Sequence, residues 1–269
     1  MTTGEAISAA SWSESETVRR ATAEQAAFYR EQGYLKFGRI FTQAEMETLG
    51  AHVDAMIAAL PEGKRPEEMD VPHFQDPGLF RYLADPRVLD VIESLIGPDI
   101  VLWSSHFIAK PQGDGKAVPW HTDGAYWGGR LIPMEVITLW LAVDASTVEN
   151  GCMRVIPGSH TAYQAALDAY QPVDTKKNVF AIRIPPELIE EEKTVDLELR
   201  VGECHFHDAW TIHGSNPNTS PYRRCGYTMR YMPAHVVHRP RPGANSHAIY
   251  LLRGEDRTGG ESVYTSVPT

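Results

Sequence analysis

The sequence has few cysteines and no long apolar run. Its 269 residues include three cysteines, Cys152, Cys204 and Cys225, too few and too scattered for a disulfide framework or a thiolate metal site. No apolar stretch approaches the roughly 18 residues that a membrane-spanning helix needs. The start of the chain also lacks the apolar core of a signal peptide. These absences predict a cytoplasmic protein with reduced thiols.

Positive charge is also scarce. Lysine and arginine total 25 against 35 aspartates and glutamates, which gives a formal net charge of −10. Without an excess of cations to neutralise phosphates, a nucleic acid or an anionic membrane is disfavoured as a partner. A local basic pocket for a small anion is compatible with this balance. We therefore expect a small-molecule substrate, and nothing in the sequence specifies the oligomeric state.

The composition along the chain predicts one folded domain. Residues 1–21 are rich in Ser, Thr, Ala and Glu and are expected to form a mobile N-terminal tail. The remainder, 22–269, is expected to be a single domain. Its expected parts are a helical layer over 22–98, a β core over 99–240 and a C-terminal segment over 241–269.

Apolar spacing predicts helices over residues 22–32, 42–60 and 79–96. Thr42 and Glu45 form a capping-box signature at the start of the second, and Gly97 follows the end of the third. Short β-prone segments separated by turn clusters follow, which favours a jelly roll over a βαβ sheet. The expected strands are IVLWSSHFIA, EVITLWLAV, CMRVI, TVDLELRV, CHFHDAWTI and CGYTMRYM.

A histidine and an aspartate stand two residues apart in PWHTDGAYWGG. In an extended strand His121 and Asp123 project to the same face. Two ligands are too few for a tight divalent site, and His213, at the end of another β-prone segment, is the candidate third. Two imidazoles and one carboxylate form the facial triad of non-haem Fe(II) oxygenases, which leaves the other metal positions open.

Basic and hydroxyl side chains follow His213 in HGSNPNTSPYRR. Arg223 and Arg224 open a strand, and a buried guanidinium binds a carboxylate through two parallel hydrogen bonds. The hydroxyl of Ser215 can add a further hydrogen bond. A 2-oxoglutarate site needs these groups at its far end.

From about residue 100 to 233 the chain resembles the phytanoyl-CoA dioxygenase family of Fe(II)/2-oxoglutarate-dependent oxygenases. The matching segments are FIAKP, PWHTD, TLWLAVDASTVENGCMRVIPGSH, HGSNPNTSPYRR and YTMRYMP. The resemblance implies a double-stranded β-helix, or cupin-like jelly roll. It also implies Fe(II), O2 and 2-oxoglutarate, with decarboxylation of 2-oxoglutarate to succinate coupled to oxidation of a substrate C–H bond, usually to a hydroxyl.

Carried over by position, the resemblance implies His121, Asp123 and His213 as iron ligands. It implies that Arg224 and Ser215 contact 2-oxoglutarate, that Trp140 lines the same pocket and that Lys110 lies nearby. Bulky aromatics around the motif are expected to wall a water-poor substrate pocket, and the glycines at 124, 128 and 129 are expected to let that loop move. The pocket candidates are Trp120, Tyr126, Trp127 and His106.

A rival arrangement uses the histidines of CHFHD. His205 and His207 would then bind the metal in a cupin-type isomerase or binding module that does not use 2-oxoglutarate. That model leaves Arg224 and the pairing of the motif with His213 unexplained, so His205 and His207 are expected to lie beside the site instead. For the substrate, the acidic composition favours a natural-product intermediate or small metabolite over a coenzyme A ester.

Overall fold

Two antiparallel sheets form the body of the protein in the computed structural model, which describes residues 17–240 and 247–268. In the major sheet, β2 (Met69–Asp70) pairs with β3 beside the main strand path. That path runs β1 (Tyr34–Arg39), β11 (Glu203–Asp208), β6 (Ile137–Ala142), β13 (Arg224–Pro233), β3 (Ile100–Lys110) and β15 (Tyr250–Arg253). The minor sheet runs β10 (Val195–Leu197), β7 (Met153–Val155), β12 (His213–Ser215) and β4 (Val118–His121).

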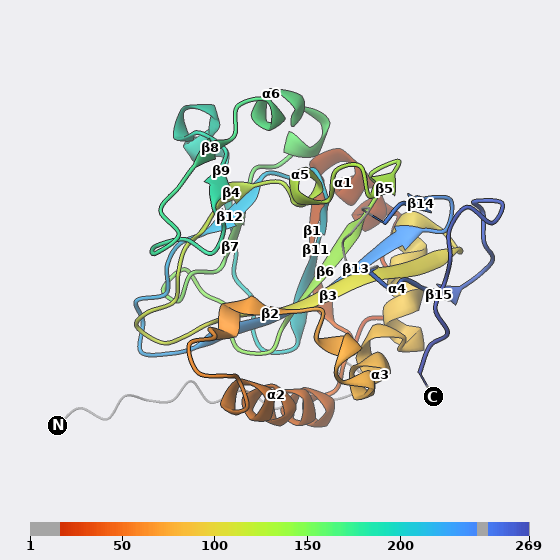
Figure 1. The fold of residues 1–269 in the computed structure, drawn as a ribbon, viewed down its shortest axis with the longest axis horizontal. Helices are drawn as coiled ribbons and strands as arrows, with labels where there is room; N and C mark the ends of the chain where they lie inside the picture. Colours follow the sequence, from red (N-terminus) through yellow and green to blue (C-terminus); the bar gives the residue numbers. More distant parts are fainter. Residues whose placement is uncertain (1–16, 241–246, 269) are drawn as a thin grey trace.

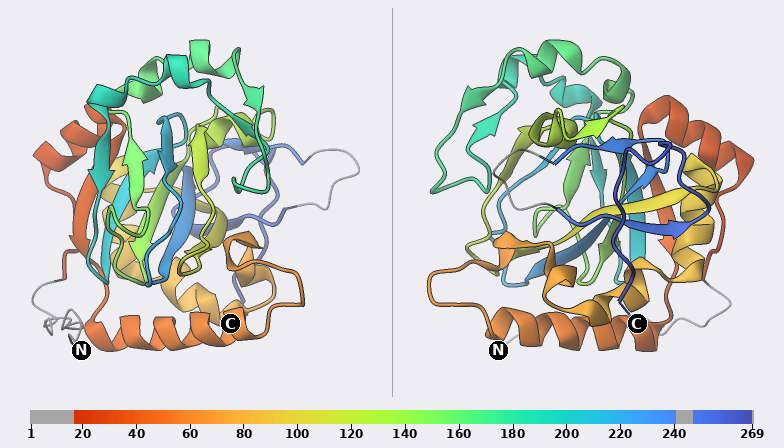
Figure 2. Two further views of the ribbon diagram at one scale, coloured as in Figure 1. Left: turned by 90° about the vertical axis from the view of Figure 1, so that its left-hand side faces the viewer. Right: turned by 45° about the vertical axis from the view of Figure 1, so that its right-hand side comes forward.

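The two sheets face each other (Figures 1 and 2). Side chains from both of them line a cavity between the sheets. Two small ribbons complete the strands, one of β5 (Leu131–Ile132) with β14 (Val237–His238) and one of β8 (Gln171–Pro172) with β9 (Ile182–Arg183). The predicted jelly roll is confirmed. The predicted mobile tail falls mostly on residues 1–16, which lie outside the described part of the chain.

The longer helices pack against the major sheet. They are α1 (Ala23–Gln32), α2 (Gln43–Ala58) and α4 (Pro86–Ile96), with the short α3 (Phe80–Leu83) between α2 and α4 (Figure 1). Leu49 and Val53 of α2 and Ile92 of α4 are fully buried in one core with Leu139 and Met229 of the sheet. The capping boxes at Thr22 and Thr42 are both formed. Two short helices, α5 (Asp123–Trp127) and α6 (Gln164–Leu167), lie away from this layer.

The N-terminal third departs from the sequence prediction in two places. The single helix expected over 79–96 is interrupted before Pro86, which has no N–H to continue the hydrogen-bond ladder, and the Asp85 side chain caps the new helix by accepting from Arg87 N at 2.8 Å. The expected helical layer also contains a strand, β1, which pairs with β11 at the edge of the major sheet. The alternation of Leu35 and Phe37, both buried, with exposed Lys36 is the signal for this strand.

The strand predicted over CHFHDAWTI is shorter than expected, because residues 209–212 form a turn. β11 ends at Asp208, whose carboxylate accepts a hydrogen bond from Trp210 N at 2.8 Å and so closes a turn. The chain then enters the minor sheet as β12, which begins at His213. This change of sheet brings His213 beside β4.

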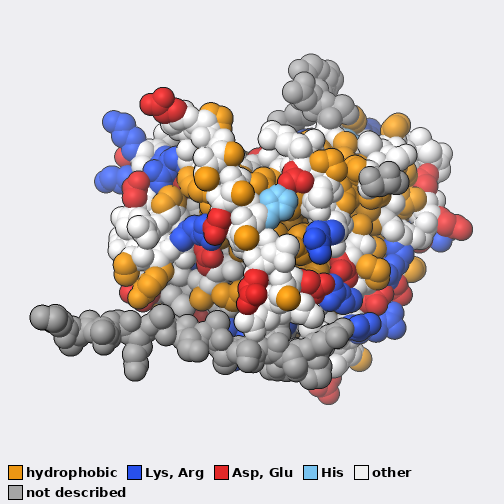
Figure 3. All heavy atoms as spheres, turned by 90° about the horizontal axis from the view of Figure 1, so that it is seen from below, with side chains coloured by type: hydrophobic (Ala, Val, Ile, Leu, Met, Phe, Trp, Pro, Cys, Tyr) orange, Lys and Arg blue, Asp and Glu red, His pale blue; other side chains and the backbone are white. Residues whose placement is uncertain are grey.

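The described residues include no helix long and apolar enough to cross a membrane. On the face seen from below, side chains of both charges are interspersed with apolar ones (Figure 3).

Glu45 ties the start of α2 to α4. Its carboxylate accepts from Thr42 N at 2.7 Å and from Arg87 Nη2 at 2.6 Å, and the Arg87 hydrogen bonds lower the pKa of Glu45 to about 2. Because this pKa lies below that of the unfolded chain, the stabilisation is present above about pH 4.3 and is lost as the pH falls toward 2. Glu45→Gln should therefore lower the free energy of unfolding at neutral pH by about 1–3 kcal/mol.

Denaturant titrations of the wild type and Glu45→Gln at neutral pH and at about pH 3 measure this difference. The gap between the two proteins should narrow at the lower pH. An equal gap at both pH values would contradict the assigned role of the ionised carboxylate.

Candidate active site

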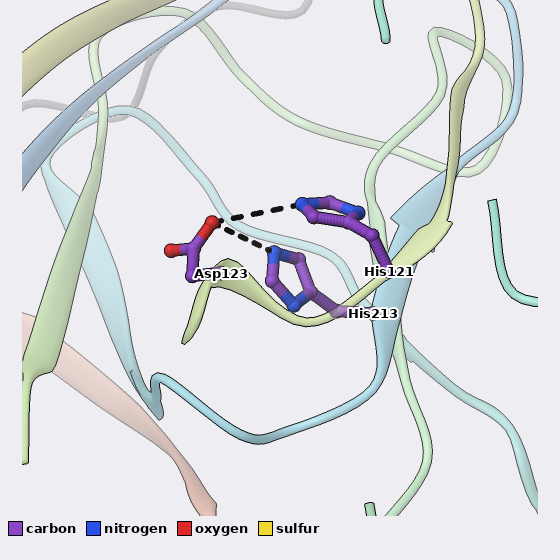
Figure 4. Close-up of side chains that lie close together, drawn as sticks. All are labelled: His121, Asp123 and His213. Carbon is purple, nitrogen blue, oxygen red and sulfur yellow. Dashed lines mark ion pairs between the residues drawn. The ribbon is translucent and has the colours of Figure 1, made fainter. Parts of the chain in front are cut away.

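Three buried side chains converge between the sheets. His121 ends β4 and is the register partner of His213, the first residue of β12. Asp123 is the first residue of α5. One ligand atom from each of the three lies within 4.8 Å of the other two. Asp123 Oδ1 is 3.6 Å from His121 Nε2 and 4.0 Å from His213 Nε2 (Figure 4).

The structure corrects one detail of the predicted motif. The strand stops at His121, so Asp123 does not belong to it. Thr122 between them remains extended, with φ −117° and ψ 138°. This single extended residue is what lets His121 and Asp123 face the same point.

Backbone carbonyls orient both imidazoles. His121 Nδ1 lies 2.8 Å from Pro119 O, and His213 Nδ1 lies 2.9 Å from Thr211 O. A carbonyl only accepts, so each Nδ1 donates its proton and each Nε2 presents a lone pair toward Asp123. Two such nitrogens and a carboxylate on one side of a central point fit Fe(II) and leave positions open for other ligands.

The protonation states suit metal ligation. Burial raises the pKa of Asp123, but the contacts with His121 and His207 and the charge of Arg230 hold it well below its usual value. Burial, together with the neighbouring histidines, lowers the pKa of His213 well below its usual value. At neutral pH the site therefore holds an ionised carboxylate beside a neutral His213, the forms in which these groups bind a metal.

The second oxygen of Asp123 faces two further side chains. His207 Nε2 is 3.6 Å and Arg230 Nε is 3.8 Å from Asp123 Oδ2. His205, by contrast, stacks on Trp140 with ring centroids 5.4 Å apart. In the described part of the chain the group that could hold a metal ion is His121, Asp123 and His213, so the structure gives no support to a metal site built on His205 and His207.

A basic pocket adjoins the three ligands. Arg224, Ser215 and Trp140 all line the cavity that contains them. Arg224 is buried, its guanidinium lies 5.3 Å from the Trp140 ring centroid, and burial lowers its pKa to about 10. Lys110 is fully buried nearby; its Nζ contacts the carbonyls of Ser215 and Asn216, and burial and the charge of Arg224 lower its pKa.

Neither of these cations has a carboxylate partner among the described residues. The ion pairs of this part of the chain do not include Arg224 or Lys110, and Arg224 Nε has no hydrogen-bond partner. A buried cation is stable only when it is paired or hydrogen-bonded. An anion that entered the cavity beside His121, Asp123 and His213 would pair with Arg224, whereas Lys110 already donates to two backbone carbonyls.

Gly226 explains how Trp140 reaches this pocket. A Cβ at Gly226 would lie 2.0 Å from a Trp140 ring atom. Any other amino acid at position 226 would therefore displace the indole. The ring thus lies across the strand next to Arg224 and shapes the wall of the pocket. The family resemblance predicted Trp140 in this pocket. A single sequence does not show that the neighbouring strand must carry a glycine at position 226 to make room for it.

The outer part of the cavity opens on the other side of the three ligands. Tyr126, Trp127 and His106, three of the residues expected from the sequence, line it together with Phe180. The ring centroid of Phe180 is 4.8 Å from that of His121 and 4.9 Å from that of Tyr126. Phe180 lies between β8 and β9, and nothing in the sequence around it predicted a role.

One expectation for this region does not hold. Trp120 lines neither part of the cavity; it packs beside Ile156, and the Arg154 guanidinium lies 5.4 Å from its ring centroid. Gly124, one of the glycines expected to let the loop move, is helical, and a Cβ there would lie 2.8 Å from the Trp210 ring. Its small size allows α5 to pack closely and fixes Asp123.

Known proteins resemble the chain over most of its length. The phytanoyl-CoA dioxygenase (PhyH) family model matches residues 29–226. The ectoine dioxygenase of Bordetella parapertussis is 26% identical over 231 residues, covering 78% of this chain and 75% of that protein. The peroxisomal phytanoyl-CoA dioxygenase of Homo sapiens is 27% identical over 227 residues, covering 76% of this chain and 66% of that protein.

Solved structures share the fold. The apo form of the non-haem monooxygenase ThoJ superimposes with a TM-score of 0.71 at 24% identity, over 91% of this chain and 87% of that one. EvdO2 from Micromonospora carbonacea var. aurantiaca, in complex with 2-oxoglutarate, gives a TM-score of 0.68 at 21% identity, over 84% of this chain and 97% of that one. At these identities the likeness establishes the architecture.

Proposed function

As a member of the phytanoyl-CoA dioxygenase family, this chain is a 2-oxoglutarate-dependent non-haem iron dioxygenase, and we propose that it hydroxylates a C–H bond of a small metabolite or natural-product intermediate. The observation that carries the proposal is the juxtaposition of two features. One is the buried cluster of His121, Asp123 and His213, and the other is the adjoining pocket with the unpaired cation Arg224.

The chain's own residues have distinct tasks in this proposal. His121, Asp123 and His213 hold Fe(II), which when bound supplies the activation of O2 that a C–H oxidation requires. Arg224 binds the far carboxylate of 2-oxoglutarate through its planar fork, and Ser215 lies beside it on the cavity wall. Lys110 adds positive charge behind the pocket, while its ammonium fixes the backbone carbonyls after His213.

Aromatic side chains keep water out of the reaction. Phe180 and Tyr126 lie within 5.7 Å of the His121 ring, measured between ring centroids. Burial raises the pKa of Tyr126, so its hydroxyl stays protonated at neutral pH. Excluding water protects a reactive oxidant from side reactions before it reaches the substrate.

The presence of Asp123 predicts hydroxylation and not halogenation. In related halogenases a small residue replaces the carboxylate ligand and leaves a coordination position to a halide, whereas here Asp123 fills that position. In chloride buffer the product of the unmodified protein should gain one oxygen atom and no chlorine by mass spectrometry. A chlorinated product would contradict this assignment.

The substrate is sought by succinate release. The names of the relatives point to two kinds of substrate, ectoine and a coenzyme A thioester, and the net charge of −10 disfavours the thioester, which carries phosphates. A panel of small metabolites and natural-product precursors, including one acyl-coenzyme A, should be tested with and without Fe(II). We expect a small metabolite to stimulate succinate release only when Fe(II) is present. Stimulation by the acyl-coenzyme A alone would contradict the proposed substrate class.

A further inference from the structure

Arg230 is the one strongly basic side chain on the outer side of the cavity among the described residues. It lies on β13 six residues after Arg224, on the same face of the strand, because side chains alternate along it. It lines both the inner and the outer part of the cavity. Arg224 and Arg230 therefore lie six residues apart on one face of β13, and both line the cavity that contains His121, Asp123 and His213.

The guanidinium of Arg230 is buried, and most of its N–H donors make no hydrogen bond to the described residues. The residue is 8% exposed, and its guanidinium carbon lies 5.1 Å from the centroid of the Trp127 ring. Its Nε has no hydrogen-bond partner. Its hydrogen bond is a long one, from Nη1 to Ser104 Oγ at 3.3 Å. An arginine has five N–H donors, so most of this buried cation's donors are unused in the described structure.

The acidic residues around the mouth do not neutralise Arg230. Glu67 pairs with Arg65 at 2.8 Å, Glu68 with Lys64 at 3.7 Å, and Asp70 lies 3.6 Å from His106 Nδ1. None of them forms an ion pair with Arg230. Among the described residues its ion-pair partner is Asp123, whose Oδ2 is 3.8 Å from Nε, beyond hydrogen-bond distance.

We propose that Arg230 binds a carboxylate of the primary substrate, so that the substrate of this enzyme is a small carboxylic acid held between Arg230 and Trp127. The proposal rests on the proposed function and specifies its substrate class. A planar carboxylate matches the guanidinium fork and satisfies its unused donors. Bound there, the substrate lies on the Asp123 side of the cavity, while Arg224 remains free for 2-oxoglutarate.

A purely structural role for Arg230 makes a different prediction. If Arg230 only balanced the charge of Asp123, its loss would weaken the binding of acids and of neutral analogues equally. A substrate-binding Arg230 affects only molecules that carry the carboxylate. Methyl esters of the same acids supply the neutral comparison, because they keep the shape and remove the charge.

The experiment uses the Fe(II) protein saturated with 2-oxoglutarate under anaerobic conditions, where no turnover occurs. Small aliphatic and aromatic carboxylic acids, each paired with its methyl ester, are titrated calorimetrically against the wild type, Arg230→Gln and Arg230→Lys. The charge-transfer band of bound 2-oxoglutarate is followed in parallel, so that an acid that merely displaces 2-oxoglutarate is recognised. Arg223→Gln is the matched control, since Arg223 forms surface ion pairs with Asp144 and Asp54.

In the wild type and in Arg223→Gln, at least one acid should bind at least about tenfold more tightly than its ester while the band persists. Arg230→Gln should remove that preference, and Arg230→Lys should restore part of it. Equal binding of acid and ester by the wild type, or no binding of any acid, would overturn the proposal. This comparison uses the wild type alone, so it does not depend on whether the variants fold. An absent band would instead refute the proposed function, so the two failures are distinguishable.

Discussion

His213→Ala should abolish succinate production and iron binding. His213 supplies one of the two imidazole nitrogens of the cluster, and its Nδ1 hydrogen bond to Thr211 O fixes the ring so that only Nε2 is free to bind a metal. Even partners that merely orient a ligand typically contribute about 10–100-fold to metal affinity or activity. We therefore expect the loss of the ligand itself to reduce 2-oxoglutarate turnover by at least about a hundredfold.

The matched control for this variant is His235→Ala. His235 is half exposed and pairs with Glu135 at 2.9 Å on the surface, so its removal should leave iron content and turnover unchanged. Iron is measured after reconstitution with Fe(II), and folding is checked by thermal melting. A folded His213→Ala protein that binds iron and turns over 2-oxoglutarate like the wild type would show that the metal lies elsewhere.

Arg224→Ala should raise the 2-oxoglutarate requirement by roughly thirtyfold or more, because truncating one partner of a buried charge pair typically costs about 2–5 kcal/mol and each tenfold is about 1.4 kcal/mol. Arg223→Ala should change it little. The two neighbours differ in their surroundings. Arg224 lines the cavity without a carboxylate partner, whereas Arg223 pairs with Asp144 at 2.6 Å and with Asp54 at 2.5 Å.

The apparent 2-oxoglutarate affinity of each variant, with melting temperatures recorded alongside, separates the two arginines. An effect confined to Arg223→Ala would contradict the alternation of side chains along β13 that places Arg224 inside. If neither variant changes the affinity, the co-substrate is bound by other residues.

The sequence predicted the metal cluster because its ligands are marked by local patterns. His121 and Asp123 stand in a short motif, and the hydroxyl and arginine that follow His213 repeat a family spacing. The structure brings these residues together and also places Trp140 and Ser215 on the cavity wall. The jelly roll could be predicted from short strands and turn clusters because strand propensity is also a local property of the sequence.

What escaped prediction depends on contacts between distant segments. Arg230 resembles any strand arginine until β13 is paired with β3 and β6 and its neighbours are known. Phe180 lies in an irregular segment whose contact with His121 is set by the path of the chain between β8 and β9. Trp120 illustrates the converse, because it stands next to a ligand in sequence but packs on the opposite side of β4.

The central claim is that His121, Asp123 and His213 bind Fe(II) with space for 2-oxoglutarate beside Arg224. The most direct test is an anaerobic titration of the Fe(II) protein with 2-oxoglutarate, followed by visible absorption. A weak charge-transfer band should appear, saturate at one 2-oxoglutarate per iron, and be absent in His213→Ala. An unchanged spectrum in the folded, iron-loaded wild type, with no succinate formed on admission of O2, would contradict the account.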